Sequence, residues 1–280
     1  MTPRWALKRG LKWAVEWGAE LSGWGLLYRQ NATFQRGYRI LNYHKISNEP
    51  RDSFTVRTDH FRAHMAYLSD HHPVTALAEL TKSLMHGEPP DPGSVAVSFD
   101  DGYLEAATVV SEILDTYSIP ATFFVVTGIL DGEKANPGGP YLAWSHVKSM
   151  AASGLDIGSH TVTHRSLGSL DPASVLQELR HSRNRIMEEL GTAPEGVAYP
   201  YGTVRDFSPT VLHAAKTAGY LYGATAVHGL NHWGCDPFRL NRTTLMAGDG
   251  PRTFRLIMRG CLDPWRLVDR WGYALQHGRS

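Results

Sequence analysis

The sequence predicts an α/β protein whose parallel sheet closes into a barrel, and three observations support this prediction. First, seven short apolar segments alternate with stretches of helical periodicity, which is typical of βα units and a parallel sheet. Second, polar side chains gather at or near the C-terminal ends of these segments, where barrel enzymes build their sites. Third, the chain has 280 residues, 42% of them hydrophobic, which is enough for one such barrel with an appendage.

The predicted strands begin after a long N-terminal segment. They are residues 39–44, 95–101, 121–128, 155–161, 196–202, 221–227 and 239–245. The predicted helices lie between and after them, near 58–70, 75–86, 103–118, 143–153, 171–190, 208–218 and 251–260. A long Gly- and Pro-containing loop is expected over 129–142. This alternation fits a closed barrel or a doubly wound sheet, and the polar strand ends favour the barrel.

The N-terminal segment has a different pattern. Residues 4–28 fit one amphipathic helix, with Trp side chains on one side and Lys, Arg and Glu on the other. Glu16 and Glu20 interrupt the apolar stretch that a cleaved signal peptide would need. The helix therefore either packs on the barrel or lies on an anionic bilayer, and both interpretations stay open. We expect three parts: the N-terminal segment 1–36, the barrel 37–250 and a helical extension 251–280.

Charge and cysteine content exclude several classes of protein. The formal net charge is +1 and no long Lys/Arg run occurs, so we expect no nucleic-acid partner. The sequence contains no run of about 18 apolar residues, so it predicts no transmembrane span. Cys235 and Cys261 form no C-x-x-C pair, which excludes a disulfide scaffold and fits a reducing compartment. The expected location is cytoplasmic, with peripheral contact at the inner membrane or secretion as open alternatives, and the oligomeric state is not predicted.

Two segments that follow predicted strands carry candidate chemistry. The strand beginning at residue 95 ends in two adjacent carboxylates, Asp100 and Asp101. Such carboxylates repel one another unless a cation or a proton separates their roles, although Asp here can also cap the following helix. His160 and His164 are four residues apart, so one helical turn would place both imidazoles on one face. The pair can chelate a metal ion, although two surface histidines would give the same pattern.

Together these segments indicate a catalytic metal site. One Asp and two His supply three protein ligands and leave a coordination position open, which is typical of catalytic zinc sites. The remaining carboxylate can then accept a proton from water at the site. A third strand end, Val-Ala-Tyr-Pro-Tyr-Gly over 197–202, predicts an aromatic-Pro turn. That turn either directs a backbone N–H at a developing oxyanion or simply forms a barrel corner.

These motifs resemble those of the NodB-homology polysaccharide deacetylases (carbohydrate esterase family 4). Ser98-Phe-Asp-Asp-Gly102, His160-Thr-Val-Thr-His164 and Tyr199-Pro-Tyr-Gly202 occur in the family's order. Leu41-Asn-Tyr-His-Lys-Ile46 and Ala198-Tyr-Pro-Tyr-Gly202 are most similar to the exopolysaccharide deacetylase branch. The resemblance implies a distorted (β/α)7 barrel and a hydrolase that removes N-acetyl, or related acyl, groups from amino sugars of a polysaccharide or glycan precursor.

The resemblance also implies a role for each site residue. Asp100 would be the general base, and the metal ligands would be Asp101, His160 and His164. The backbone N–H of Tyr201 would help to form the oxyanion hole. The implied cofactor is one divalent metal ion, with Zn²⁺ expected and Co²⁺, Ni²⁺ or Mn²⁺ as substitutes.

The sequence departs from the family's pattern at two points. The third motif often carries an Arg that orients the base, but residues 196–199 contain none. Arg242, at the end of the last strand, is the expected substitute, with a salt bridge at the barrel rim as the alternative. The late Leu-x-His motif that supplies the general acid has no counterpart after Leu245. We expect His44, at the end of the first strand, to be that acid, because histidine titrates near neutrality.

Several alternatives stay open. The Trp-rich N-terminal helix also fits a deacylase of a lipid-linked sugar at the membrane surface. The missing late His motif also fits a glycan-binding barrel without turnover, although such a module needs no base beside a metal. A glycosidase that uses Asp100 and Asp101 is excluded, because adjacent side chains on a strand point to opposite faces. If His44 only binds a substrate hydroxyl or a rim loop, the next candidates for the acid are His228 and His232.

Overall fold

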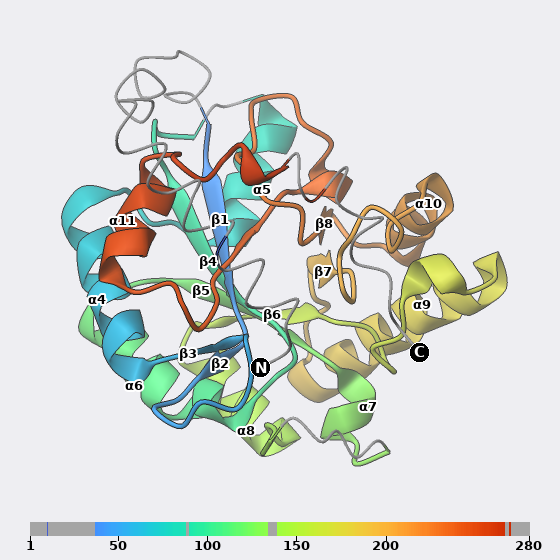
Figure 1. Ribbon diagram of the computed structural model, residues 1–280. Coiled ribbons are helices and arrows are strands. Elements are labelled where there is room, and N and C mark those ends of the chain that lie inside the picture. The colour runs from blue at the N-terminus through green and yellow to red at the C-terminus, as the bar shows by residue number, and fades with distance from the viewer. Residues whose placement is uncertain (1–9, 11–36, 88–89, 134–138, 267–268, 270–280) are drawn as a thin grey trace.

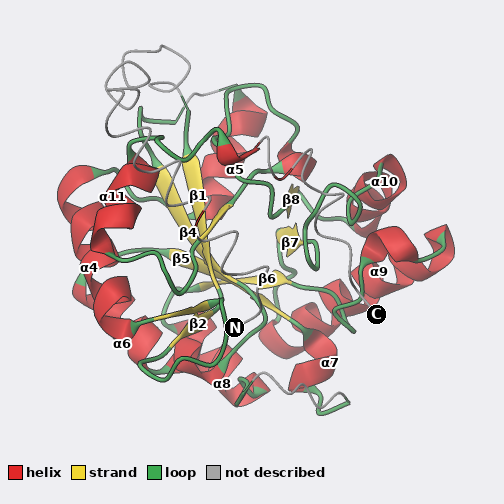
Figure 2. Ribbon diagram, in the orientation of Figure 1, coloured by secondary structure: helices red, strands yellow, loops and turns green. Residues whose placement is uncertain are grey.

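The computed structural model has a parallel, curled sheet of seven strands surrounded by helices (Figures 1 and 2). The residues that it describes are 10, 37–87, 90–133, 139–266 and 269. The predicted distorted (β/α) barrel is confirmed. The predicted N-terminal helix over 4–28 lies outside the described residues, apart from residue 10, and the three-part division of the chain stays a prediction. None of the described helices is both long enough and apolar enough to cross a bilayer.

The order of the strands across the sheet is β8-β7-β6-β5-β4-β1-β9. Their bounds are β1 (Arg39–Tyr43), β4 (Val95–Phe99), β5 (Ala121–Val125), β6 (Asp156–Ser159), β7 (Gly196–Ala198), β8 (Tyr222–Ala224) and β9 (Thr243–Thr244). Each strand ends before its predicted limit, because the last predicted residues belong to the loops that carry the polar side chains. A second, two-stranded sheet of β2 (Lys45–Ile46) and β3 (Thr55–Val56) was not predicted.

One short segment, residues 240–244, joins the two edges of the sheet. Its end, β9, pairs in parallel with β1. Its beginning, Leu240, forms a parallel bridge with Ala224 of β8 and accepts a hydrogen bond of 2.8 Å from the Thr225 N–H. Because both edge strands find a partner in this segment, the curled sheet closes.

The helices lie outside the sheet (Figure 2). The predicted ones are observed as α4 (Thr58–His71), α5 (Leu77–His86), α6 (Val109–Thr116), α8 (Trp144–Ala152), α9 (Pro172–Leu190), α10 (Pro209–Ala218) and α11 (Pro251–Met258). The helix predicted over 103–118 is observed in two parts rather than one: a 3-10 helix, η1 (Leu104–Ala107), precedes α6, and Thr108 between them has non-helical backbone angles. Two more 3-10 turns are η2 (Leu167–Ser169) and η3 (Pro237–Arg239).

Helix starts follow the local sequence. The Asp171 carboxylate caps α9 by accepting hydrogen bonds from the backbone N–H groups of Ala173 and Ser174. Pro172 occupies the first turn of the helix. Ser208 and Pro209 start α10 in the same way. The predicted loop over 129–142 begins instead within a short unpredicted helix, α7 (Thr127–Leu130). Four residues are too few to show helical periodicity in a sequence.

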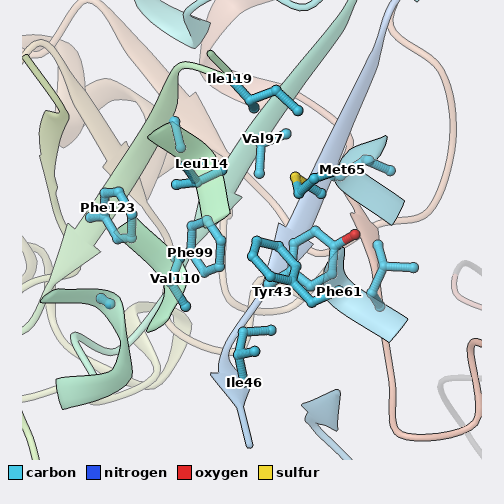
Figure 3. Close-up of a cluster of buried hydrophobic side chains, with 14 of the residues drawn as sticks. Tyr43, Ile46, Phe61, Met65, Val97, Phe99, Val110, Leu114, Ile119 and Phe123 are labelled. Carbon is cyan, nitrogen blue, oxygen red and sulfur yellow. The ribbon is translucent and has the colours of Figure 1, made fainter. Parts of the chain in front are cut away.

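The hydrophobic core fixes the ends of the strands that precede the polar residues. Figure 3 shows Tyr43 and Phe99, the last residues of β1 and β4, packed with Phe61 of α4. The ring centroids of Tyr43 lie 5.1 Å from Phe61 and 5.5 Å from Phe99, and those of Phe99 and Phe123 are 4.7 Å apart. Burial of each such ring stabilises the fold by roughly 1.5–3 kcal/mol. The residue after each strand is thereby held at the rim of the barrel.

Candidate active site

Asp100 follows β4 and lies inside the barrel, where its side chain is 4% exposed. Its Oδ1 and Oδ2 accept hydrogen bonds of 2.7 Å from Nη1 and Nη2 of Arg242. The Asn42 side-chain amide donates a third bond, of 3.0 Å, to Oδ2. Arg242 is 1% exposed and also donates from Nε to the Thr225 carbonyl at 2.7 Å. Arg242 therefore does not form a solvent-exposed salt bridge at the barrel rim. Its planar guanidinium fixes the orientation of the Asp100 carboxylate.

The charge state of Asp100 reflects two opposed effects. Burial raises the pKa of the carboxyl, but the nearby Arg242 guanidinium favours the charged form, as do His160 and the hydrogen bonds from Arg242. The net result is a pKa below the ordinary value for Asp. Asp100 is therefore ionised at neutral pH.

The second carboxylate, Asp101, faces the two histidines. Asp101 has φ of 73° and Gly102 has φ of 77°, so the chain turns sharply after the strand. Oδ1 of Asp101 lies 3.5 Å from Nε2 of His160 and 3.2 Å from Nε2 of His164. Burial raises the pKa of Asp101, but the hydrogen bond with His164 and the nearby imidazoles lower it well below the usual range. The alternative that these carboxylates cap a helix is wrong, because the N-cap of η1 is Tyr103 and receives no side-chain cap bond.

The turn that carries the two histidines is not helical, so that part of the prediction is wrong. Thr161 and His164 have φ of 68° and 54°, in the left-handed region. The turn is closed by a hydrogen bond of 3.2 Å from the His164 N–H to Oγ1 of Thr161. The two imidazole centroids lie 4.8 Å apart. The imidazoles are thus brought together by left-handed backbone rather than by helical spacing.

His160 is held in a defined orientation. Its Nδ1 lies 2.7 Å from the Ala198 carbonyl oxygen, which can only accept a hydrogen bond. Nδ1 therefore carries the proton, and Nε2 presents a lone pair toward Asp101. Burial lowers the pKa of His160 to about 4, so the imidazole is neutral at neutral pH. A neutral imidazole is the form that binds metal ions.

Asp101, His160 and His164 form the one cluster of three potential metal ligands found among the described residues. Their ligand atoms, one carboxylate oxygen and two imidazole nitrogens, all lie within 4.8 Å of one another. This mixed oxygen and nitrogen donor set suits a divalent ion such as zinc, and three protein ligands leave a coordination position open. The residues present therefore fit the ion that the sequence predicts.

The two remaining predicted site residues lie beside this cluster. Nε2 of His44 is 4.0 Å from Oδ2 of Asp100, and the His44 ring packs on Phe54 with centroids 4.8 Å apart. The Tyr201 side chain is 46% exposed, and its ring centroid lies 5.1 Å from that of His164. Tyr201 has φ of 63°. The structure thus brings all seven predicted site residues to one rim of the barrel.

The alternative candidates for the general acid lie elsewhere. After β8 the chain folds back, and Asn231 forms an antiparallel bridge with Tyr38, which precedes β1. Nε2 of His228 lies 3.4 Å from Asp263, which pairs with Arg39 at the start of β1. The His232 ring lies beside Gly37. Both histidines therefore pack against residues at or before the start of β1, whereas His44 lies 4.0 Å from Asp100 and is the better placed candidate for the acid.

Sequence reasoning missed Asn42, which is 1% exposed. Its side-chain oxygen accepts hydrogen bonds from Arg242, at 2.9 Å, and from Ser98, at 3.1 Å, while its amide donates to Asp100. A signal was present: Asn42 lies two residues before His44, so both belong to the same face of the first strand. A polar residue within a buried strand, in step with a candidate site residue, indicates a group that faces the site.

Comparisons with known proteins show which proteins this chain is similar to. A family model described as polysaccharide deacetylase matches residues 87–223. YxkH of Bacillus subtilis, whose name places it among the polysaccharide deacetylases, is 29% identical over 210 residues, which cover 75% of this chain and 71% of that protein. The poly-beta-1,6-N-acetyl-D-glucosamine N-deacetylase of Staphylococcus aureus is 25% identical over 222 residues, 71% of this chain and 73% of that protein.

The fold is also found among solved structures. The deacetylase PplD of Streptococcus pyogenes, solved in complex with acetate, superposes with a TM-score of 0.71. The superposition covers 79% of this chain and 98% of that one, at 24% sequence identity. At this identity the likeness establishes a shared fold.

Proposed function

Since this chain belongs to the NodB-homology polysaccharide deacetylase family, we propose that it is a metal-dependent enzyme that hydrolyses the N-acetyl groups of amino sugars in a polysaccharide. One observation carries the proposal. A cluster of three metal-ligand side chains lies beside a second carboxylate, Asp100, which is ionised and held by two hydrogen bonds from Arg242. This is the pairing of a ligand set with a separate proton acceptor that hydrolysis of an amide requires.

Asp101, His160 and His164 would hold the ion. A divalent ion bound there supplies Lewis-acid polarisation of the amide carbonyl and acidifies water. Zinc fits the donor set best, and Co²⁺, Ni²⁺ or Mn²⁺ are the substitutes to test. The Nδ1–H of His160, bonded to the Ala198 carbonyl, keeps the opposite nitrogen directed toward Asp101.

Asp100 is the proposed general base. Amide hydrolysis needs a group that takes a proton from the attacking water, and that group must be unprotonated at neutral pH. The lowered pKa of Asp100 meets this requirement, while the bidentate contact with Arg242 fixes the direction in which its lone pairs point. A carboxylate with a low pKa is a weak base, so its value here lies in position rather than in intrinsic basicity.

Two further residues complete the proposed mechanism. The backbone N–H of Tyr201 donates a hydrogen bond to the oxygen of the amide carbonyl as negative charge develops on it. His44, 4.0 Å from Asp100, gives a proton to the nitrogen as the C–N bond breaks. The products are acetate and a free amino sugar, which accounts for every atom of the amide and the water.

The proposed substrate class is a polymer or oligomer of N-acetylglucosamine. A deacetylase of poly-beta-1,6-N-acetyl-D-glucosamine is similar over 71% of this chain, and a chitooligosaccharide deacetylase of Bradyrhizobium is 31% identical over 51% of it. Both names describe enzymes that act on N-acetylated glucosamine chains. The linkage that this chain prefers is therefore a choice between β-1,6 and chitin-type oligomers.

The test is acetate release coupled to metal analysis on the purified full chain. β-1,6-linked and chitin-type N-acetylglucosamine oligomers of equal length are offered to protein that is metal-replete, chelator-treated or reconstituted with each ion. We expect release of acetate with at least one oligomer, loss of release on chelation and recovery with Zn²⁺ or Co²⁺. Oligomer binding without acetate release by metal-replete protein would instead identify a glycan-binding barrel.

A further inference from the structure

The turn between His160 and His164 adopts a backbone conformation that its own sequence does not favour. Thr161 has φ of 68°, and a β-branched residue in the left-handed region is unfavourable because Cβ crowds the backbone. His164 has φ of 54° as well. Both imidazoles face Asp101 only while this turn keeps its shape. Contacts from outside the turn must therefore stabilise it.

The strongest of these contacts comes from Glu178 of α9. Its Oε2 accepts hydrogen bonds of 3.0 Å from the backbone N–H groups of both Val162 and Thr163. Its Oε1 accepts a bond of 2.6 Å from Oγ1 of Thr163. Hydrogen bonds to a carboxylate are shorter and stronger than those between neutral groups. One side chain thus binds the two peptide groups at the centre of the turn.

A second element holds the opposite side of the same turn. The first two N–H groups of α7, those of Thr127 and Gly128, donate to the carbonyls of Thr161 and Val162 at 3.1 and 3.0 Å. A Cβ on Gly128 would lie 2.7 Å from the Val162 oxygen, so this approach requires glycine. The turn is therefore clamped: its carbonyls bind α7, and its N–H groups bind Glu178.

The part of α9 that carries Glu178 is itself held in place by packing. Its neighbours on α9, Val175 and Leu179, are buried in a hydrophobic cluster with β7 and α10. Asp131, at the end of α7, pairs with Arg185 of α9 at 2.8 Å and so ties the two sides of the clamp together. The position of the carboxylate is thereby determined by the packing of a 19-residue helix rather than by the turn.

We propose that Glu178 is a positioning residue for the metal site, holding the turn 161–164 so that His160 and His164 present their Nε2 atoms to the ion. The inference rests on the proposed metal site and adds to it a residue outside the ligand set. Glu178 also lines a pocket of about 220 Å³ together with Thr163 and His181. Truncation of Glu178 therefore enlarges an existing pocket instead of creating a cavity in the core, and the variant is expected to fold.

The experiment measures the affinity of the chelator-stripped full chain for Zn²⁺ by competition with a chromophoric chelator, and the d–d absorption spectrum of its Co²⁺ form. Glu178→Ala removes both acceptor oxygens and with them all three hydrogen bonds to the turn. Glu178→Gln keeps an oxygen acceptor for the two N–H groups and a polar partner for Thr163, and serves as the conservative rescue. The matched control is Glu188→Ala, an exposed carboxylate on the same helix.

We expect Glu178→Ala to weaken Zn²⁺ affinity by about 10–100-fold, the usual effect of removing an outer partner of a metal ligand, and to alter the Co²⁺ spectrum. Glu178→Gln should recover most of the affinity, and Glu188→Ala should match the wild type. Gly128→Ala, which pushes on the turn from the other side, should weaken affinity too, and it tests the clamp if Glu178→Ala does not fold.

The outcomes separate this inference from the proposed function. If the wild type binds no Zn²⁺, the proposed metal site itself is wrong. If the wild type binds Zn²⁺ and Glu178→Ala binds it with wild-type affinity and an unchanged Co²⁺ spectrum, the positioning role is overturned; where Glu178→Ala does not fold, the same result for Gly128→Ala overturns it. Equal losses in Glu178→Ala and Glu178→Gln would also overturn it, because charge rather than hydrogen bonding would then be responsible.

Discussion

Arg242 and Asp100 are 142 residues apart in the chain, yet their side chains form two parallel hydrogen bonds of 2.7 Å inside the barrel. Both side chains are almost completely buried. A planar guanidinium opposite a planar carboxylate leaves the carboxylate little freedom to rotate. The contact thus couples the last strand of the sheet to the candidate base after β4.

The first prediction concerns this pair. Arg242→Lys keeps the charge but cannot bond both carboxylate oxygens in one plane, so we expect kcat to fall by roughly 10–100-fold with metal content unchanged. Arg242→Ala leaves Asp100 buried and unpaired, which should lower the free energy of unfolding by about 3–5 kcal/mol. Steady-state kinetics and urea unfolding measure the two effects. A Lys variant with wild-type kcat would contradict the orienting role.

The second prediction separates the adjacent carboxylates. Asp100→Asn should retain stoichiometric metal and lose about 10²–10⁴ in kcat, which is the usual worth of a general base. Asp101→Asn should lose metal, because an amide is a much weaker ligand than a carboxylate. Metal content and acetate release are measured on the same preparations. Equal loss of metal in both variants would show that the roles are assigned wrongly.

A third prediction tests His44 against a histidine at the other end of the barrel. If His44 protonates the departing amine, His44→Ala should lower kcat by about 10²–10⁴ with little change in KM. His232→Ala serves as the control, since His232 lies beside Gly37, ahead of β1, and should leave kcat unchanged. A raised KM with normal kcat in His44→Ala would make His44 a substrate-binding residue instead.

The fourth prediction concerns stability and pH. His64 of α4 is fully buried, and its ring stacks on Phe254 of α11 with centroids 4.0 Å apart. Burial lowers its pKa to about 3 from an ordinary value of 6.5. Between these two pKa values the unfolded chain binds a proton at His64 and the folded chain does not. The contribution of His64 to the free energy of unfolding is therefore fully present above about pH 6.5 and is lost as the pH falls toward 3.

Unfolding by urea at several pH values measures this slope. His64→Gln should make the dependence shallower between about pH 6.5 and 4, although it also loses the ring contact with Phe254 and should be less stable at neutral pH. His86→Gln, which changes an exposed histidine at the end of α5, should leave the slope as it is. A slope that is the same in His64→Gln and the wild type would rule out His64 as its source.

The sequence predicts best those features that depend on neighbouring residues. Seven strands could be placed because each is an apolar run that ends in polar or turn-forming residues. Asp100, Asp101, His160 and His164 could be singled out because each pair belongs to one short segment that follows a strand. The match to the family model spans residues 87–223, so it includes these four residues but neither His44 nor Arg242.

Features that depend on distant contacts could not be predicted in the same way. Asn42 joins the site through bonds to residues 58 and 200 positions away, and no local pattern encodes those distances. The turn at 160–164 departs from a helix because α7 and Glu178 hold it, and both contacts come from other elements. The spacing of the histidines predicted the same candidate ligands that the structure brings together, but through helical geometry that the turn does not have.

The closure of the sheet by residues 240–244 has a consequence for the order in which the candidate site assembles. The same segment that pairs with β1 and β8 carries Arg242, so the candidate base acquires its partner only when the barrel closes. During synthesis from the N-terminus, every proposed metal ligand leaves the ribosome well before Arg242 does. On the proposed mechanism, a chain that lacks this segment keeps the residues of the proposed metal site but has no partner that orients Asp100, so we expect hydrolysis only after the last strand docks.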